Sequence, residues 1–176
     1  MSDSPQGQHP TGDAGRARPV AFVVEGRPPS SNKNVGASGL RYQQHVAQLY
    51  RAAGGTWSNE HRYGVVYYFL RRYRPSRDAD VGNVTKRLWD ALTGVGYADD
   101  EVVRLQLAGL IETGGSDTHS VDLAQLDLTD IPLAALAALL DKIDGGSEHL
   151  LYIEIGLLQP TMYVFNLAGS QQRGTT

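Results

Sequence analysis

The sequence contains no cysteine among its 176 residues. Disulfide bonds, cysteine nucleophiles and thiolate-based zinc or iron–sulfur sites are therefore excluded. It also lacks any apolar run near the roughly 18 residues that a membrane-spanning helix needs. Residues 1–18 are polar and rich in Gly, Pro and Ser, without the apolar segment of a secretory signal. We expect no membrane association and a cytoplasmic location.

Basic residues are scarce in the second part of the chain. Residues 1–100 carry 13 Lys and Arg against 9 Asp and Glu, whereas residues 101–176 carry 3 against 10, so the net charge of −3 conceals a basic first part. This asymmetry permits a basic working surface on an acidic body. The length favours one domain, which we expect to span 19–167 between disordered tails at 1–18 and 168–176.

The spacing of apolar residues predicts a mixed α/β (α+β) fold, a small mixed β-sheet packed with helices. The expected helices span 40–53, 83–93 and 133–143, and the expected strands span 20–24, 61–70, 102–111 and 149–158, with a short edge at 163–167. Glycines close each helix. The strand at 61–70 is apolar on both faces, which favours a central place in the sheet. A helical turn can precede the strand at 102–111.

An arginine-rich segment follows the expected central strand. Four arginines surround a tyrosine within seven residues: Arg71, Arg72, Arg74 and Arg77. Guanidinium groups bind phosphates bidentately, which favours contact with DNA over the alternative, an exposed and solvated loop. Arg27 and Lys33, in an earlier proline-containing loop, could also contact phosphate, although solvated surface charge is the more ordinary interpretation for them.

Acidic residues gather directly after these arginines. Asp78 and Asp80 alternate with position 82, which in an extended segment puts all three on one side of the chain. Asp99 and Asp100 return after one helix length. Oxygen ligands of this kind suit Mg²⁺, which is typically held by one or two carboxylates plus water and substrate phosphate. The alternative is structural, because Asp80 is a good helix N-cap and acids in a first helical turn complement the helix dipole.

Polar residues also share one face of the expected helix at 83–93. Asn83, Lys86 and Asp90 stand at i, i+3 and i+7, and such residues lie close together on a helix. A lysine beside a metal site could stabilise charge on a phosphoryl group in transfer. An asparagine there could orient a carboxylate or a metal-bound water. The pattern indicates metal-assisted phosphodiester chemistry.

The motif Asp80-x-x-Asn83-x-x-Lys86, followed by Trp89-Asp90-Ala91-Leu92-Thr93-Gly94-Val95 and Tyr97-Ala98-Asp99-Asp100-x-x-Val103, resembles the RusA family of Holliday junction resolvases. The resemblance covers roughly residues 20–112 and includes the expected first strand and the loop after it. It implies a small α/β endonuclease, an intertwined homodimer, that needs Mg²⁺ (or Mn²⁺) and resolves four-way DNA junctions by paired nicks.

The resemblance also implies roles for individual residues. Asp80, Asp100 and Lys86 would be catalytic, and the metal would be held by Asp80 and Asp100 with help from Asp99. Asn83 and Asp78 would support them. The arginines at positions 71, 72, 74 and 77, with Lys33 and Arg27, would contact the arms of the junction.

One family position departs from the pattern, because Gly82 stands where the family has a second catalytic aspartate. Three interpretations follow: the site is inactive, it keeps weak activity with Asp99 or water filling the gap, or Asp78 compensates through a local bulge. Reduced activity is the central expectation, since a hard cation loses a negative ligand. The chain is thus expected to be a junction nuclease, with a non-catalytic junction-binding module and a plain α/β interaction domain as alternatives.

Overall fold

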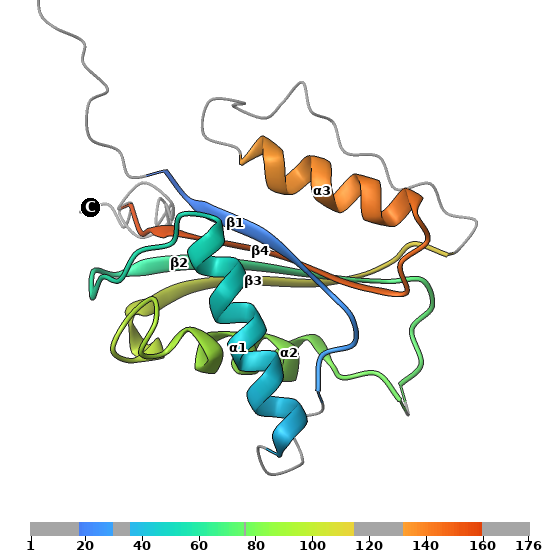
Figure 1. Cartoon of the computed structure of the whole chain (residues 1–176), viewed down its shortest axis with the longest axis horizontal. Coiled ribbons are helices and arrows are strands. Elements are labelled where there is room, and N and C mark those ends of the chain that lie inside the picture. The colour runs from blue at the N-terminus through green and yellow to red at the C-terminus, as the bar shows by residue number, and fades with distance from the viewer. Residues whose placement is uncertain (1–17, 30–35, 76, 115–131, 160–176) are drawn as a thin grey trace, which may run out of the picture.

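The computed structural model describes residues 18–29, 36–75, 77–114 and 132–159. Within these ranges three helices pack on a four-stranded mixed sheet (Figure 1), which confirms the α+β class predicted from the sequence. Lys33, the expected edge at 163–167, the tail at 168–176 and nearly all of the tail at 1–18 lie outside the described residues.

The elements follow the predicted order. They are β1 (Val20–Glu25), α1 (Ala37–Ala52), β2 (Arg62–Leu70), α2 (Val81–Leu92), the 3₁₀ turn η1 (Asp100–Val102), β3 (Val103–Glu112), α3 (Leu133–Asp144) and β4 (His149–Leu157). Their ends differ from the expected ones by at most three residues. The helical turn expected before the third of these strands is η1. Glycines follow all three helices, and Gly54, Gly94 and Gly146 have positive φ, the conformation in which glycine avoids the Cβ clash.

The strand order in the sheet is β1-β4-β2-β3. The strand β2 pairs antiparallel with β4 and parallel with β3, so its predicted central place is confirmed. Every second residue of β2, from Arg62 to Leu70, is buried. Because side chains alternate along a strand, these residues form one continuous covered face.

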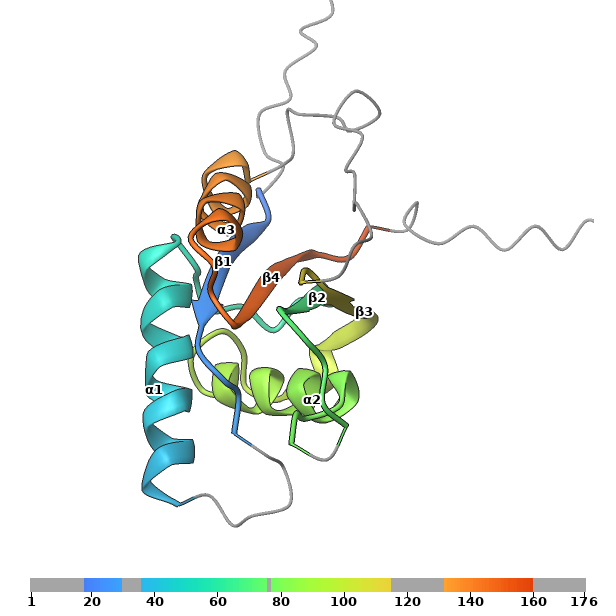
Figure 2. The same ribbon diagram turned by 90° about the vertical axis from the view of Figure 1, so that its right-hand side faces the viewer.

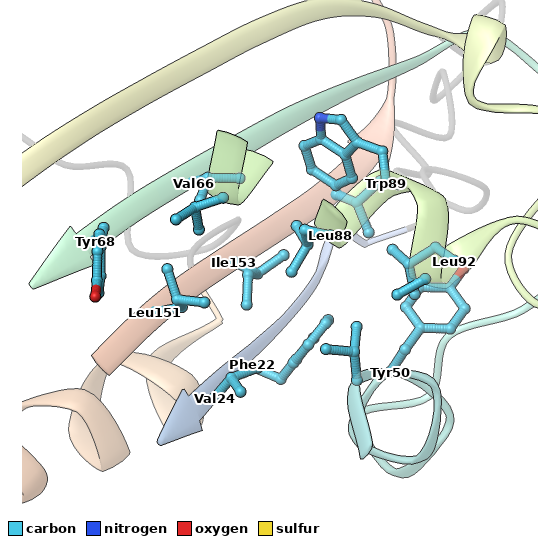
Figure 3. Close-up of a cluster of buried hydrophobic side chains, with 14 of the residues drawn as sticks. Phe22, Val24, Tyr50, Val66, Tyr68, Leu88, Trp89, Leu92, Leu151 and Ile153 are labelled. Atoms are coloured by element: carbon cyan, nitrogen blue, oxygen red, sulfur yellow. The ribbon is translucent and has the colours of Figure 1, made fainter. Parts of the chain in front are cut away.

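The two faces of the sheet are covered unequally. Helices α1 and α2 lie on one face and α3 on the other (Figures 1 and 2), where α3 packs on β1 and β4. The core under α1 and α2 is the larger one and contains Tyr50, Leu88, Trp89 and Leu92 from the helices (Figure 3). The apolar side of α2 is therefore held firmly against the sheet, which fixes the orientation of its polar side.

Trp89 is the anchor of α2. Its side chain is buried, and its indole Nε1 donates a hydrogen bond to Oε1 of Gln106 on β3 at 3.0 Å. Its ring lies directly on the backbone of Gly64, where a Cβ atom would come within 2.4 Å of the ring. A glycine in the middle of β2 thus lets α2 approach the sheet closely.

Candidate functional site

The start of α2 carries the first group of candidate residues. Asp80 is the N-cap: its Oδ1 accepts a hydrogen bond from the backbone N–H of Asn83 at 2.8 Å, and its Oδ2 accepts from Asn83 Nδ2. Helix α2 already begins at Val81, so Gly82 is helical. The extended alternation predicted for positions 78, 80 and 82 is therefore wrong. The extended backbone ends at the N-cap, Asp80, two residues before position 82.

A tight turn after α2 returns the chain to the same helix. Gly94 N–H donates to the carbonyl of Tyr97 at 2.7 Å, and the buried hydroxyl of Tyr97 donates to the carbonyl of Trp89 at 2.9 Å. Burial raises the pKa of Tyr97, so its hydroxyl stays protonated and keeps donating. The turn delivers Asp99, the N-cap of η1, and then Asp100.

A pocket of about 270 Å³ lies between α2, β3 and Asp100 of η1, and we call it the α2 pocket. It brings together three positions of the predicted motif, Gly82, Lys86 and Asp100. Its remaining lining consists of Thr85, Trp89, Gln106 and Ala108. Asp80 lies at its edge, since Oδ1 of Asp80 is 3.3 Å from the place that a Cβ of residue 82 would take. Residues from the two separate segments therefore meet at one place.

Negative charge gathers around Asp100, which lines the α2 pocket. Partial burial raises the pKa of Asp100, and the neighbouring Asp99, which shares a hydrogen bond with it, raises it further. Asp90 on α2 acts in the same direction, and Lys86 acts against them. Crowded carboxylates of this kind are stabilised by a nearby cation, so the charge balance of the pocket suits a bound metal ion.

Asp100 is the only carboxylate among the described residues that line the α2 pocket. Among residues 18–29, 36–75, 77–114 and 132–159, no three acidic or histidine side chains converge in a way that could hold a metal ion. Asp80, Asp99 and Asp100 are thus not assembled into one three-carboxylate cluster. Gly82 supplies no ligand, and both Asp80 and Asp99 accept helix-capping hydrogen bonds. A cation there would depend on water and substrate for most of its ligands.

Position 82 has room for the missing carboxylate. Its backbone φ is not positive, and a Cβ built on it meets only Asp80 Oδ1, at 3.3 Å, within 4 Å. That oxygen also accepts the capping hydrogen bond from Asn83, so it would have to shift by a few tenths of an ångström. An aspartate at this position would therefore be compatible with the backbone of a residue that lines the α2 pocket.

Asp78 lies in a different environment. Its side chain is only 3% exposed; Oδ1 accepts a hydrogen bond from Arg27 at 2.6 Å and Oδ2 accepts one from the backbone N–H of Arg74 at 2.7 Å. Both of its oxygens are thus engaged by the loop around it. Nothing in this geometry directs Asp78 to the α2 pocket, as the third interpretation of the motif requires.

The arginines expected to bind DNA gather around Asp78. A depression of about 590 Å³ is lined by Arg27, Arg71, Arg72, Arg74 and Arg77 together with Asp78, Gly114, Glu148 and His149. We call it the arginine depression. The five arginines come from two loops far apart in sequence, the one after β1 and the one between β2 and α2. Lys33, the sixth basic residue predicted to contact DNA, is outside the described residues.

Sequence reasoning missed the residues that other strands contribute. Gln106 on β3 lines the α2 pocket, and its only signal was a polar residue among the apolar ones of that strand. His149 and Glu148 line the arginine depression from the start of β4. No local pattern marks them, because their position depends on how β4 pairs with β2.

Comparison with models of known protein families and with curated proteins gives no match. The resemblance to the RusA family thus rests on the motif residues themselves. No helix within the described ranges has the length and apolar character needed to cross a bilayer.

Proposed function

We propose that this chain is a metal-dependent, structure-specific endonuclease that acts on four-way DNA junctions, as its motif implies. The observation that carries the proposal is the α2 pocket, where Gly82, Lys86 and Asp100 line one cavity although they lie on two segments separated by a turn. The arginine depression, at the other end of the short loop that leads into α2, supplies the positive charge that a DNA backbone requires.

The roles of the side chains in this proposal are those that the resemblance implies. Asp100 and Asp80 would hold Mg²⁺ or Mn²⁺, helped by Asp99, and Asn83 keeps the Asp80 carboxylate oriented. The exposed ammonium group of Lys86 would meet the charge that builds up on the phosphate. When bound, the metal would supply Lewis acidity and lower the pKa of a water.

A homodimer is part of the proposal, because paired nicks in a roughly two-fold symmetric junction require two sites. Two features support a contact with a second copy. Among the described strands, β3 is bonded to β2 alone and forms an edge of the sheet. Leu107 on this strand is 54% exposed. Sheet edges are frequent sites of pairing between chains.

A second candidate is a non-catalytic junction-binding module of the same fold. The absence of a carboxylate at Gly82, together with the lack of a three-carboxylate cluster in the described residues, favours it. Both candidates predict junction binding, and they differ in whether the phosphodiester is cut.

A nicking assay on a synthetic four-way junction with Mg²⁺ separates the two candidates. We expect wild-type protein to nick weakly and Gly82→Asp to nick at least tenfold faster, because it restores a ligand that the backbone can accommodate. Asp100→Asn is the inactive control, and Gly82→Ala controls for the change in helix propensity. If Gly82→Asp stays at background while it binds junctions normally, the α2 pocket is not a nuclease site.

A further inference from the structure

The arginine depression has features of a built anion site. Its five arginines outnumber its two acids, Asp78 and Glu148, so the formal charge of its lining is +3. Burial lowers the pKa of His149, whose Nδ1 is 2.8 Å from the hydroxyl of Tyr68, so the imidazole adds no charge at neutral pH. The positive charge therefore comes from guanidinium groups.

Asp78 holds two of these arginines in place through hydrogen bonds. Its buried carboxylate bonds to the Arg27 guanidinium and to the backbone of Arg74, and the N–H groups of Arg77 and Asp78 close the turn on the carbonyl of Arg74. The backbone N–H of Arg71 donates to the carbonyl of Glu148, which ties the start of the loop to the residue before β4. The loop is thus held at both ends.

The guanidinium groups of the loop arginines are accessible to a ligand. Arg71, Arg72, Arg74 and Arg77 are exposed, and none of them forms an ion pair with another described residue. The Arg27 side chain keeps 46% of its surface exposed despite its bond to Asp78. Several exposed arginines that line a common depression and form no ion pair with a described acid match the needs of phosphate oxygens.

We propose that the arginine depression binds a phosphodiester segment of the DNA without any metal ion, and that Asp78 is the positioning residue that arranges it. The identity of the polyanion as DNA rests on the proposed function. Arg77 and Gly82 are five residues apart, so their Cα atoms lie at most about 18 Å from each other. That distance corresponds to about five nucleotide steps along a duplex axis, so the two sites are close enough to lie on one arm of a junction.

The test is fluorescence anisotropy of a labelled DNA duplex and a four-way junction in EDTA, over a range of salt concentrations. The double variant Arg72→Gln/Arg74→Gln should weaken binding at least tenfold and lower the slope of log K against log salt by about 2, since each lost phosphate contact removes about 0.9. The matched control, Arg41→Gln/Arg51→Gln, removes two exposed arginines of α1 outside the depression and should change the affinity less than threefold. Equal losses in both would overturn the inference.

Asp78→Asn tests the positioning role separately. It adds one unit of positive charge, so charge alone predicts tighter binding, whereas loss of the arranged loop predicts binding several-fold weaker. Tighter binding by a folded variant would overturn the role of Asp78. If the variant does not fold, the exposed arginine variants still decide whether the depression binds DNA.

The two proposals fail independently. Binding in EDTA is measured without cleavage, so it tests the arginine depression and leaves the metal chemistry of the α2 pocket out. If Gly82→Asp nicks as expected and the arginine variants have no effect on binding, the proposed role of the depression is wrong and the nuclease proposal stands. Arginine-dependent binding to an RNA duplex, with none to DNA, would overturn the DNA assignment.

Discussion

Asp78 and Asp80 stand two residues apart and lie in opposite environments. Asp78 is buried, and both of its oxygens accept hydrogen bonds, one of them from a guanidinium group. Asp80 is exposed and contacts Asn83, which has no charge. The arginine depression is built on the first residue, and the α2 pocket is edged by the second.

The difference shows how a carboxylate's partner decides what it can do. A carboxylate already paired with a guanidinium group is neutralised and contributes to structure. One with only neutral hydrogen-bond partners keeps its charge available for a cation. By this criterion Asp80 can serve a cation and Asp78 cannot, although the two lie only two residues apart.

Replacing each aspartate by alanine is the most direct way to break this comparison. Asp78→Ala should lower the free energy of unfolding by about 3 kcal/mol, at the lower end for a broken buried pair because Arg27 is half exposed. Asp80→Ala should cost only about 1 kcal/mol, the usual value of an N-cap. Urea unfolding of both variants measures the difference, and equal losses would contradict the assignment of Asp78 as structural.

The effect of Mg²⁺ on stability tests whether the α2 pocket, unlike the surroundings of Asp78, can bind a cation. In Gly82→Asp, Mg²⁺ at ten times its dissociation constant should stabilise the folded chain by about 1.4 kcal/mol. Gly82→Ala gains helix propensity without a new ligand and should show a smaller Mg²⁺ effect at the same concentration. Thermal unfolding with and without Mg²⁺ checks both variants. A Mg²⁺ effect of the same size in Gly82→Ala would remove position 82 from the metal site.

Glu25 gives the smallest expected effect, since it is an exposed carboxylate with a cationic partner. Its Oε2 is 2.5 Å from Lys142 Nζ and its Oε1 accepts from Ser147 Oγ at 2.7 Å. The Lys142 hydrogen bond, followed by that from Ser147, lowers the pKa of Glu25 below its usual 4.5. Its contribution is therefore present above about pH 4.5 and is lost as pH falls through the lowered pKa.

Glu25→Gln should accordingly cost less than about 1 kcal/mol at neutral pH, the range of exposed ion pairs. The variant should also lose less stability than wild type between about pH 5 and pH 3. Urea unfolding across this range provides the measurement. A penalty as large as that of Asp78→Ala would show that burial does not distinguish the two carboxylates.

The repeating apolar pattern was the most informative part of the sequence. Val84, Leu88 and Leu92 predicted the buried side of α2, and all three are fully buried. The same pattern put Lys86 and Asp90 on the exposed side, where the structure has them. These predictions succeeded because a helix buries one side whatever it packs against.

The start of α2 was predicted less well. Asp78, Asp80 and position 82 look equivalent as an alternating series, and only the N-cap at Asp80 shows where the extended chain ends. Asp80 was recognised as a cap candidate, but nothing local chose between a cap and a metal ligand. The partner that removes Asp78 from the site, Arg27, lies 51 residues earlier in the chain.

The sequence by itself determined the order of helices and strands, the central place of β2 and the residues of α2 that face solvent, because these depend on short-range periodicity and burial. Only the tertiary structure decided that Asp100 returns to Lys86 and Gly82, that Asp78 pairs with Arg27, and that five arginines from two loops share one depression. These long-range contacts depend on how distant segments pack across the sheet, which no local sequence pattern encodes.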